Sequence, residues 1–289
     1  MTEKLRTDAG TSARVPCAFT VDVEDYYMVT AFERTVPFET WGAYESRVAR
    51  NTQRVMDLLE EAAVKATFFV LGWVAEREPA LVRAIAASGH EVACHGYRHR
   101  MIGAMNPGTF RDDLRRAKSV LEDLGGAAVK GFRAPSWSIT AETMWALDVL
   151  IEEGFTYDSS IFPIHHDRYG VPGAERFPHT LQRPGGSILE IPPSTIRFAG
   201  LNFPVAGGGY LRLLPLWLTR RALRSINLRE RRPCIIYVHP WEIDPDQPRM
   251  PCALPTRFRH YTGLAGTSAK LRTLLSEFAF ARLCDSRFQ

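Results

Sequence analysis

Short apolar runs alternate along this chain with longer segments in which apolar residues recur at helical spacing. Runs rich in β-branched and aromatic residues are typical of buried strands, and the helical spacing is typical of helices packed on one face. The runs that predict strands are 18–23, 66–71, 91–94, 131–134, 155–158, 188–191 and 234–239. The segments that predict helices are 47–63, 79–88, 109–124, 140–153, 211–228 and 268–278. Strands that alternate with helices indicate an α/β fold of parallel βαβ units, and this number of strands favours barrel-like closure over an open sheet.

The remaining segments complete the outline of the chain. Residues 1–16 are polar and lack the apolar core of a signal peptide, so we expect a flexible tail followed by one domain over 17–289. No apolar run reaches the length of about 18 residues that predicts a membrane-spanning helix. Long loops over 161–183 and 244–261 are expected either to close a pocket or to border an open groove.

Composition narrows the class of protein. Hydrophobic residues make up 45% and charged residues 24%, as in an ordinary soluble protein. The net charge of +4 is spread along the chain, which argues against nucleic-acid binding. The five cysteines are scattered and form no C-x-x-C pair, so we expect reduced thiols and a cytoplasmic protein.

Five residues with ionisable side chains fall at or just after the ends of predicted strands. They are Asp22, His95, Arg133, Asp158 and His239. In parallel α/β folds the ligand lies at the carboxyl ends of the strands. We therefore expect these side chains to share one site.

The first strand ends in a cluster of acids, Asp22, Glu24 and Asp25. Alternation along a strand points Asp22 and Glu24 to the same side. Like charges repel, so a cation or a shared proton is expected there, and the alternative is a solvated acidic turn.

His95 and His99 follow the third strand, four positions apart. If the chain makes a helical turn there, both imidazoles can face one point, and neutral imidazole is a common ligand of zinc-like metals. The pattern is not the H-E-x-x-H of metalloproteases. Together with the acids it offers two nitrogens and one oxygen, which is a catalytic metal site with an open position.

Three further segments are more often structural when taken alone. Arg133 precedes a proline turn and can hold a carboxylate, although a surface arginine is the alternative. Asp158 follows a short strand, and His239 leaves an apolar strand into an aromatic turn.

Taken in order, five segments resemble the five motifs of the NodB-homology polysaccharide deacetylases, which form carbohydrate esterase family 4. The segments are 20–25, 95–99, 133–137, 157–160 and 237–242. The resemblance covers about 18–240 and leaves a C-terminal extension over 241–289. Segments 23–27, 239–244 and 247–249 further resemble the subgroup encoded beside exopolysaccharide and exosortase loci.

The resemblance implies a role for each of these positions. Asp22 matches the general base, Arg133 the residue that orients it, His239 the general acid and Asp158 the partner of that acid. His95 and His99 match the metal-binding histidines. The family's metal-binding aspartate directly follows the base, but this chain has Val23 there. The third ligand is then Glu24, favoured by alternation, or Asp25 if the chain bulges after Val23.

The resemblance implies an α/β fold built as an incomplete (β/α)7-type barrel with parallel strands. It also implies metal-dependent removal of N-acetyl groups from a polysaccharide or an exopolysaccharide precursor, with zinc as the expected ion. Aromatic residues beside the motifs, Tyr26, Trp137 and Trp241, offer flat faces for sugar rings, although core packing explains them equally well. The alternatives are hydrolysis of a small cyclic amide or urea-like substrate on the same fold, and a catalytically silent glycan-binding module.

The segment 211–232 is rich in arginine and leucine. A solvated basic face of a barrel helix is one interpretation, and peripheral contact with the inner membrane face is the other. The arginines concerned are Arg212, Arg220, Arg221, Arg224, Arg229, Arg231 and Arg232.

Overall fold

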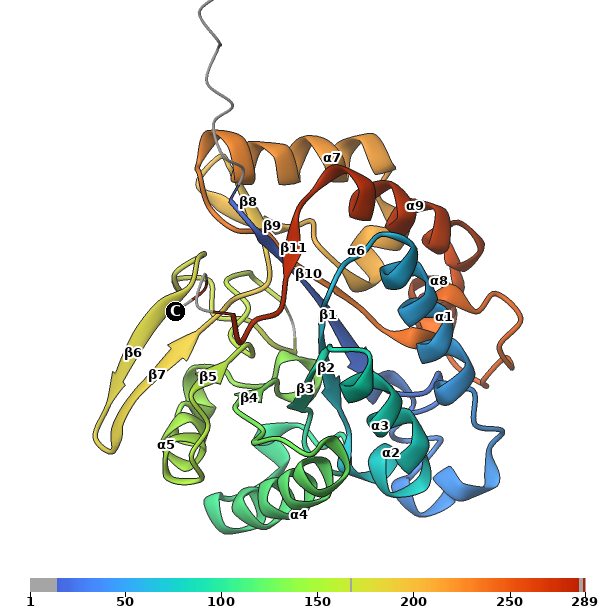
Figure 1. Cartoon of the computed structure of the whole chain (residues 1–289), viewed down its shortest axis with the longest axis vertical. Coiled ribbons are helices and arrows are strands. Elements are labelled where there is room, and N and C mark those ends of the chain that lie inside the picture. The colour runs from blue at the N-terminus through green and yellow to red at the C-terminus, as the bar shows by residue number, and fades with distance from the viewer. Residues whose placement is uncertain (1–14, 167, 286–287, 289) are drawn as a thin grey trace, which may run out of the picture.

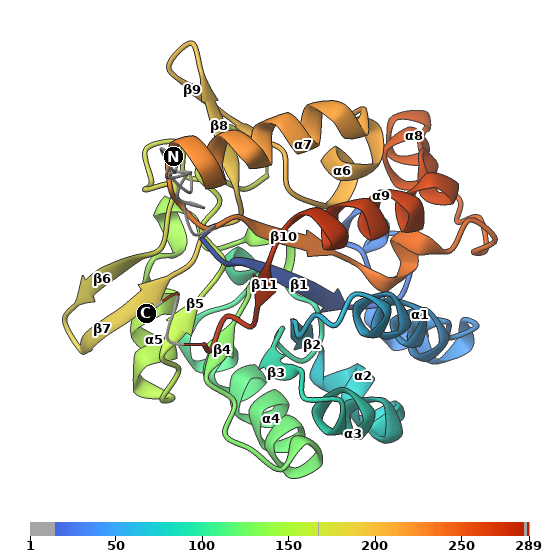
Figure 2. The ribbon, with the colours of Figure 1, turned by 45° about the horizontal axis from the view of Figure 1, so that its top comes forward.

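Buried parallel strands form the centre of the molecule. The computed structural model describes residues 15–285 except 167, together with residue 288, so the expected tail over 1–16 lies almost wholly outside the described residues. The parallel strands run in the order β10-β1-β2-β3-β4-β5-β7, and β6 pairs with β7 in the antiparallel sense at one edge (Figures 1 and 2). Their bounds are β1 (Cys17–Val23), β2 (Thr67–Val70), β3 (Glu91–Cys94), β4 (Gly131–Phe132), β5 (Tyr157–Asp158), β6 (His179–Arg183), β7 (Gly186–Glu190) and β10 (Ile235–Val238). The expected α/β fold with a mostly parallel sheet is confirmed.

Helices surround this sheet, as Figure 1 shows. The helices of the N-terminal half are α1 (Val48–Glu61), α2 (Gly72–Arg77), α3 (Pro79–Ala87), α4 (Pro107–Gly125) and α5 (Trp145–Glu152). Those of the C-terminal half are α6 (Gly208–Leu213), α7 (Leu216–Arg224), α8 (Leu254–Tyr261) and α9 (Leu264–Glu277). Short turns of 3-10 helix lie at Thr30–Phe32, Phe38–Ala43, Ile102–Ala104, Pro135–Trp137, Ala141–Thr143 and Pro240–Ile243, and a π-helical turn at Ser225–Arg229.

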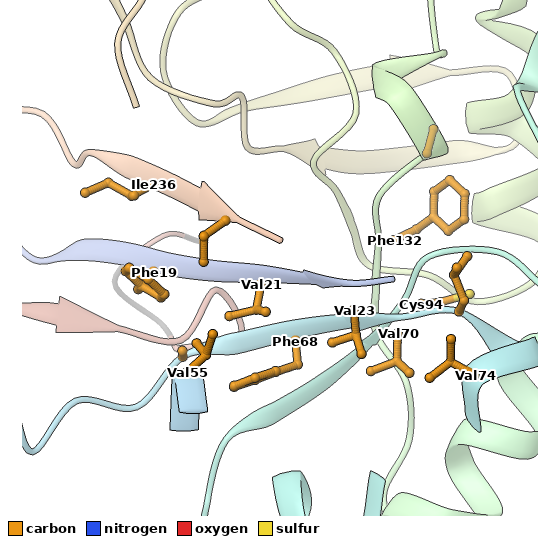
Figure 3. Close-up of a cluster of buried hydrophobic side chains, with 14 of the residues drawn as sticks. Phe19, Val21, Val23, Val55, Phe68, Val70, Val74, Cys94, Phe132 and Ile236 are labelled. Atoms are coloured by element: carbon orange, nitrogen blue, oxygen red, sulfur yellow. The ribbon is translucent and has the colours of Figure 1, made fainter. Parts of the chain in front are cut away.

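The alternation of side chains along β1 separates the core from the site. Val21 and Val23 point into the hydrophobic layer with Phe68 and Val70 of β2 (Figure 3). Successive side chains of a strand point to opposite faces, so Asp22 points away from this layer. Val23 is therefore a core residue. Because this position points away from the side on which Asp22 lies, a metal ligand is not expected there.

The sheet does not close into a full barrel through strand pairing. Between β7 and β10, the Ser194 N–H donates to the Ile235 carbonyl (3.2 Å) and the Ile235 N–H donates to Ser194 Oγ (2.8 Å). These two bonds join the two sides of the sheet through a loop.

The structure differs from the sequence-based outline mainly in the C-terminal half. The segment 211–228 is not one helix, because Pro215 separates α6 from α7. The expected loops 161–183 and 244–261 contain β6 and α8. A two-stranded hairpin, β8 (Thr195–Phe198) and β9 (Leu201–Pro204), was not expected, nor was the short edge strand β11 (Phe280–Ala281), which pairs with β1.

Two expectations about the whole chain can be compared with the described residues. All five cysteines are free thiols, as expected. Within the described ranges no helix is long and apolar enough to cross a membrane.

Candidate active site

Three buried side chains converge at the carboxyl ends of β1 and β3. One ligand atom from each of Glu24, His95 and His99 lies within 4.8 Å of the others. Nε2 of His99 lies 2.7 Å from Oε2 of Glu24, yet no hydrogen bond satisfies this buried oxygen among the described residues. An unsatisfied buried carboxylate oxygen that faces imidazole nitrogens fits the ligand set of a cation. The three residues therefore fit one divalent ion.

The surroundings hold these ligands in the ionisation states that a metal requires. Burial raises the pKa of Glu24, but His99 and His239 outweigh burial and keep that pKa well below its usual range. Burial lowers the pKa of His95 to about 4, so its imidazole is neutral at pH 7. Nδ1 of His95 lies 2.7 Å from the Arg133 carbonyl. Donation to that carbonyl leaves the lone pair of Nε2 free for a metal.

The turn between the two histidines is irregular, and the two imidazoles converge without the helical turn on which the sequence argument depended. Gly96 and His99 both have positive φ, +75° and +53°. The Tyr97 N–H donates to Oδ2 of Asp113 on α4 (2.6 Å), and a Cβ at position 96 would lie 3.1 Å from the same oxygen. Glycine is thus required where the backbone passes α4 before it brings His99 back beside His95.

Asp25, the other candidate ligand, points away from this set. Its carboxylate accepts backbone N–H groups from Tyr26 (2.9 Å), Arg47 (2.6 Å) and Val48 (3.0 Å). Asp25 therefore satisfies amides at the start of α1, which are left unpaired within the helix. The structure does not support a metal role for Asp25, because Glu24 and not Asp25 groups with the two histidines.

A buried arginine fixes the orientation of Asp22. Nη1 of Arg133 donates to Oδ1 of Asp22 (2.6 Å) and to Thr20 Oγ1 (2.8 Å). Nη2 and Nε of Arg133 donate to the hydroxyl (2.9 Å) and carbonyl (3.2 Å) of Ser159. The contact with Asp22 expected for Arg133 is present, and it leaves Oδ2 of Asp22 facing the cavity, 3.8 Å from Nε2 of His239.

His239 lies across the cavity and is held by residues that sequence reasoning missed. Nε2 lies 3.6 Å from Oε1 of Glu24, while Nδ1 lies 3.2 Å from Oε2 of Glu242. That same Glu242 oxygen accepts the His239 backbone N–H (3.0 Å), and the other oxygen accepts Nε of Arg212 (2.7 Å). Burial opposes the charged form of His239, but Glu24, Glu242 and Asp22 outweigh it and raise its pKa to about 9.

Arg212 is buried inside the molecule, so its expected place on a basic surface is wrong. Its guanidinium also donates to the backbone carbonyls of Arg259 (2.8 Å), His260 (3.0 Å) and Thr262 (2.7 Å). Burial raises the pKa of Glu242, but His239 and Arg212 outweigh burial and lower that pKa to about 2. Glu242 is therefore a fixed negative charge behind His239. Its only sequence signal was its place three positions after His239.

Asp158 does not contact His239, which contradicts its expected role as the partner of the acid. Its Oδ1 accepts the Ser160 hydroxyl (2.5 Å), which in turn accepts the Ala134 N–H (2.7 Å). The strand register places Asp158 beside Glu190 of β7. Burial raises the pKa of Asp158 to about 6. Asp158 supports the loop after β4, and Glu242 occupies the place beside His239.

The indole of Trp241 connects the two halves of the site. Nε1 donates to Oε1 of Glu24 (3.1 Å), and the ring stacks between His239 (5.3 Å, 20°) and His260 (4.2 Å, 16°). Nε2 of His260 lies 2.9 Å from Oε1 of Gln247. Trp241 thus positions a ligand and an imidazole in addition to lining the cavity.

A cavity of about 620 Å³ opens onto these groups. Trp137 and Trp241 line it, and Trp137 also packs against the Arg133 guanidinium (4.6 Å). Tyr26 is 1% exposed and does not line the cavity, because its ring packs on Tyr27 in the core. A sugar-binding role for Tyr26 is therefore contradicted.

Family comparisons agree with this geometry. A model of the polysaccharide deacetylases matches residues 40–156, and a model of a domain of unknown function (DUF3473) matches residues 159–286. Residues 40–156 thus match the polysaccharide deacetylase family, and residues 159–286 match the second domain. The first match contains both histidines and Arg133, the second contains Arg212, His239 and Glu242, and Glu24 precedes both.

Individual relatives share part of the chain. It is 29% identical over 149 residues to a peptidoglycan-N-acetylglucosamine deacetylase of Bacillus cereus, an alignment that covers 47% of this chain and 53% of that protein. It is 36% identical over 100 residues to a chitooligosaccharide deacetylase of Sinorhizobium fredii, covering 34% of this chain and 44% of that protein. The chain thus spans about half the length of these relatives.

Solved structures show the same fold. A putative polysaccharide deacetylase from Mycobacterium smegmatis superposes with a TM-score of 0.62 at 23% identity, over 93% of this chain and 86% of that one. An allantoinase superposes with a TM-score of 0.63 at 15% identity, over 94% and 88%. These likenesses concern the fold alone.

Proposed function

We propose that this protein is a metal-dependent deacetylase that removes N-acetyl groups from a polysaccharide or an exopolysaccharide precursor and releases acetate. The observation that carries the proposal is the approach of Asp22 and His239 to 3.8 Å (Oδ2 to Nε2) in the wall of one cavity, which the cluster of Glu24, His95 and His99 also lines. Hydrolysis of an acetamide needs a base for the attacking water, an acid for the departing amine and stabilisation of the developing oxyanion.

Asp22 supplies the base. Oδ1 is occupied by Arg133, so Oδ2 is the oxygen that accepts a proton from water in the cavity. Because the other two nitrogens of Arg133, Nε and Nη2, are anchored on Ser159, the carboxylate stays in one orientation when it takes the proton. Each such proton transfer typically contributes about 10²- to 10⁴-fold to the rate.

His239 supplies the acid. The carboxylate of Glu242 accepts Nδ1–H, which directs Nε2–H toward the cavity and stabilises the cationic imidazole. An amine is a poor leaving group, so its nitrogen must receive that proton as the C–N bond breaks.

Glu24, His95 and His99 would hold the metal ion, for which zinc is the proposed identity. The chemistry that such an ion supplies is Lewis-acid polarisation of the carbonyl and of the attacking water. Trp137 and Trp241 line the cavity and are proposed as the apolar faces for a sugar ring.

The direct experiment measures acetate release from a panel of N-acetylated oligosaccharides, before and after removal of metal with a chelator and after re-addition of zinc. We expect release that chelation abolishes and zinc restores, and none with Asp22→Asn. A panel arm with allantoin and related cyclic ureides tests the alternative on the same fold. Hydrolysis in that arm alone would contradict the proposal, as would acetate release by the metal-free protein.

A further inference from the structure

The exposed apolar side chains of this protein are confined to one region. In the described part of the chain, all eight exposed large hydrophobic side chains lie within residues 198–258. Seven of them come from one hairpin and three helices and are here called the apolar rim. The apolar rim consists of Phe198, Leu201 and Phe203 of the β8–β9 hairpin, Leu213 and Trp217 of α6 and α7, and Leu254 and Phe258 of α8. Gathered exposed apolar groups mark an interaction site more often than scattered ones do.

Two of these helices, α6 and α8, border the cavity. Leu213 itself lines the cavity, as do Thr256 and Arg259 of α8. On the hairpin side, Nδ2 of Asn202 donates to the Pro163 carbonyl (2.8 Å), at the start of the loop whose residues line the cavity wall. Figure 2 shows the hairpin standing out from the body near one end of α7, with α6 and α8 toward the other end of α7.

The β8–β9 hairpin projects from the molecule with exposed apolar side chains at its tip. Its turn, Ala199-Gly200, is formed by two residues with positive φ (+48° and +81°), and Phe198 and Leu201 flank that turn. Phe198 is 73% exposed, and its ring meets Phe203 edge-on. A projecting tip with apolar side chains on both strands has no described partner in the molecule that would explain its composition.

The charge of this region indicates which kind of surface it would bind. Residues 191–229 contain six arginines and no acidic residue, and residues 247–276 also contain none. Three of the six arginines have acidic partners, since Arg212 is buried on Glu242 and Arg220 and Arg224 share the single carboxylate of Glu277. Of the others, Arg197 on the hairpin and Arg221 on α7 are exposed without an acidic partner among the described residues, and so is Arg257 on α8.

We propose that the apolar rim docks on an anionic phospholipid bilayer and places the mouth of the cavity at the lipid headgroups. Apolar side chains combined with arginines, without intervening acids, are the composition of interfacial membrane-binding surfaces. The surface differs from the basic helix expected from the sequence, because it includes the hairpin and α8 and excludes Arg212. It would give the site access to a glycan held at a membrane.

Vesicle co-sedimentation tests the proposal with the whole chain. Vesicles of phosphatidylcholine mixed with phosphatidylglycerol should pellet the protein, vesicles of phosphatidylcholine alone should pellet much less, and added salt should weaken the binding. Each arginine near an anionic surface contributes about fivefold to partitioning, so Arg221→Glu with Arg257→Glu should weaken binding by about 25-fold or more. Phe198→Ser with Leu201→Ser should weaken it by at least about tenfold.

The control carries the same change of net charge on another face. Arg54 and Arg83 are exposed on α1 and α3, and Arg54→Glu with Arg83→Glu should leave binding within about twofold. Circular dichroism and thermal unfolding verify that each variant is folded, so the result does not depend on enzyme activity. Absence of binding to the anionic vesicles, or an equal loss in the control, would overturn the proposal. It would also be overturned if the chain forms a dimer that Phe198→Ser with Leu201→Ser dissociates while vesicles bind neither form.

Discussion

Glu242 offers the sharpest test of how the acid is held, through the single substitution Glu242→Gln. In the native site both carboxylate oxygens accept from donors: Oε1 from Arg212, and Oε2 from the backbone N–H and Nδ1 of His239. An amide has only one acceptor oxygen, so its NH₂ group must face either Arg212 or His239, which also donate. The substitution therefore breaks one side of this arrangement whichever way the amide turns.

The stability cost follows from burial. The side chains of Arg212 and Glu242 are 3% and 1% exposed. Removing one partner of a buried ion pair costs about 3–5 kcal/mol. The lower end, about 3 kcal/mol, is expected here because Arg212 keeps three carbonyl acceptors. Urea unfolding measures this loss. Glu277→Gln is the matched control, because it makes the same chemical change beside Arg224 near the surface, where about 1 kcal/mol or less is expected.

The kinetic consequence separates positioning from stability. With His239 no longer oriented, hydrolysis of an N-acetyl amide should fall by about 10²- to 10³-fold in kcat. An activated acetyl ester, whose leaving group needs no proton, should lose less than about tenfold under conditions where the variant is folded. Equal losses on amide and ester, or an unchanged rate on the amide, would refute the positioning role of Glu242.

Four further outcomes follow from the same geometry. Asp25→Asn should destabilise the protein by about 1–2 kcal/mol in urea unfolding, since it weakens the cap of α1, yet keep full metal content, and loss of metal would return Asp25 to the ligand set. Trp241→Phe should weaken zinc affinity by about tenfold in a competition titration with a chromogenic chelator, because Glu24 loses its indole donor, and unchanged affinity would make the contact incidental. Asp22→Asn should bind zinc with near-native affinity but lose at least about 10²-fold in acetate release, whereas parallel loss of metal would make Asp22 a ligand. Burial lowers the pKa of His90 to about 4, below its usual 6.5, so between these pH values the unfolded chain binds a proton that the folded chain does not. The free energy of unfolding should therefore fall as pH drops from about 6.5 toward 4. His90→Asn, which keeps an acceptor for the Ala66 N–H, should flatten that slope, and a slope unchanged in the variant would assign it to other groups.

The strands and the edge that carries the site could be predicted from the sequence. Apolar runs locate β1, β3 and β10, and parallel topology brings their carboxyl ends together. Alternation along β1 was enough to favour Glu24, because it places Val23 in the core. These inferences depend on the local periodicity of apolar residues, and the strands form where that periodicity predicts them.

The partners of His239 could not be predicted, because they depend on how distant segments pack. The family pattern pointed to Asp158, which the register of β5 and β7 directs toward Glu190. Glu242 reaches His239 only through the 3-10 turn Pro240–Ile243, and Arg212 arrives from a helix that Pro215 ends. Asp25 and Tyr26 are residue types that are common in such sites, but the local backbone directs Asp25 to the start of α1 and Tyr26 into the core.

The central claim is that Glu24, His95 and His99 hold one metal ion, and anomalous diffraction at the zinc edge from zinc-loaded crystals tests it most directly. The account expects one strong peak per chain, about 2.0–2.2 Å from Oε2 of Glu24 and from Nε2 of each histidine. The peak should be absent from crystals of Glu24→Gln grown with the same zinc and present in those of Asp25→Asn. A peak ligated by Asp25 or by His239, or no peak at the three residues, would contradict the account.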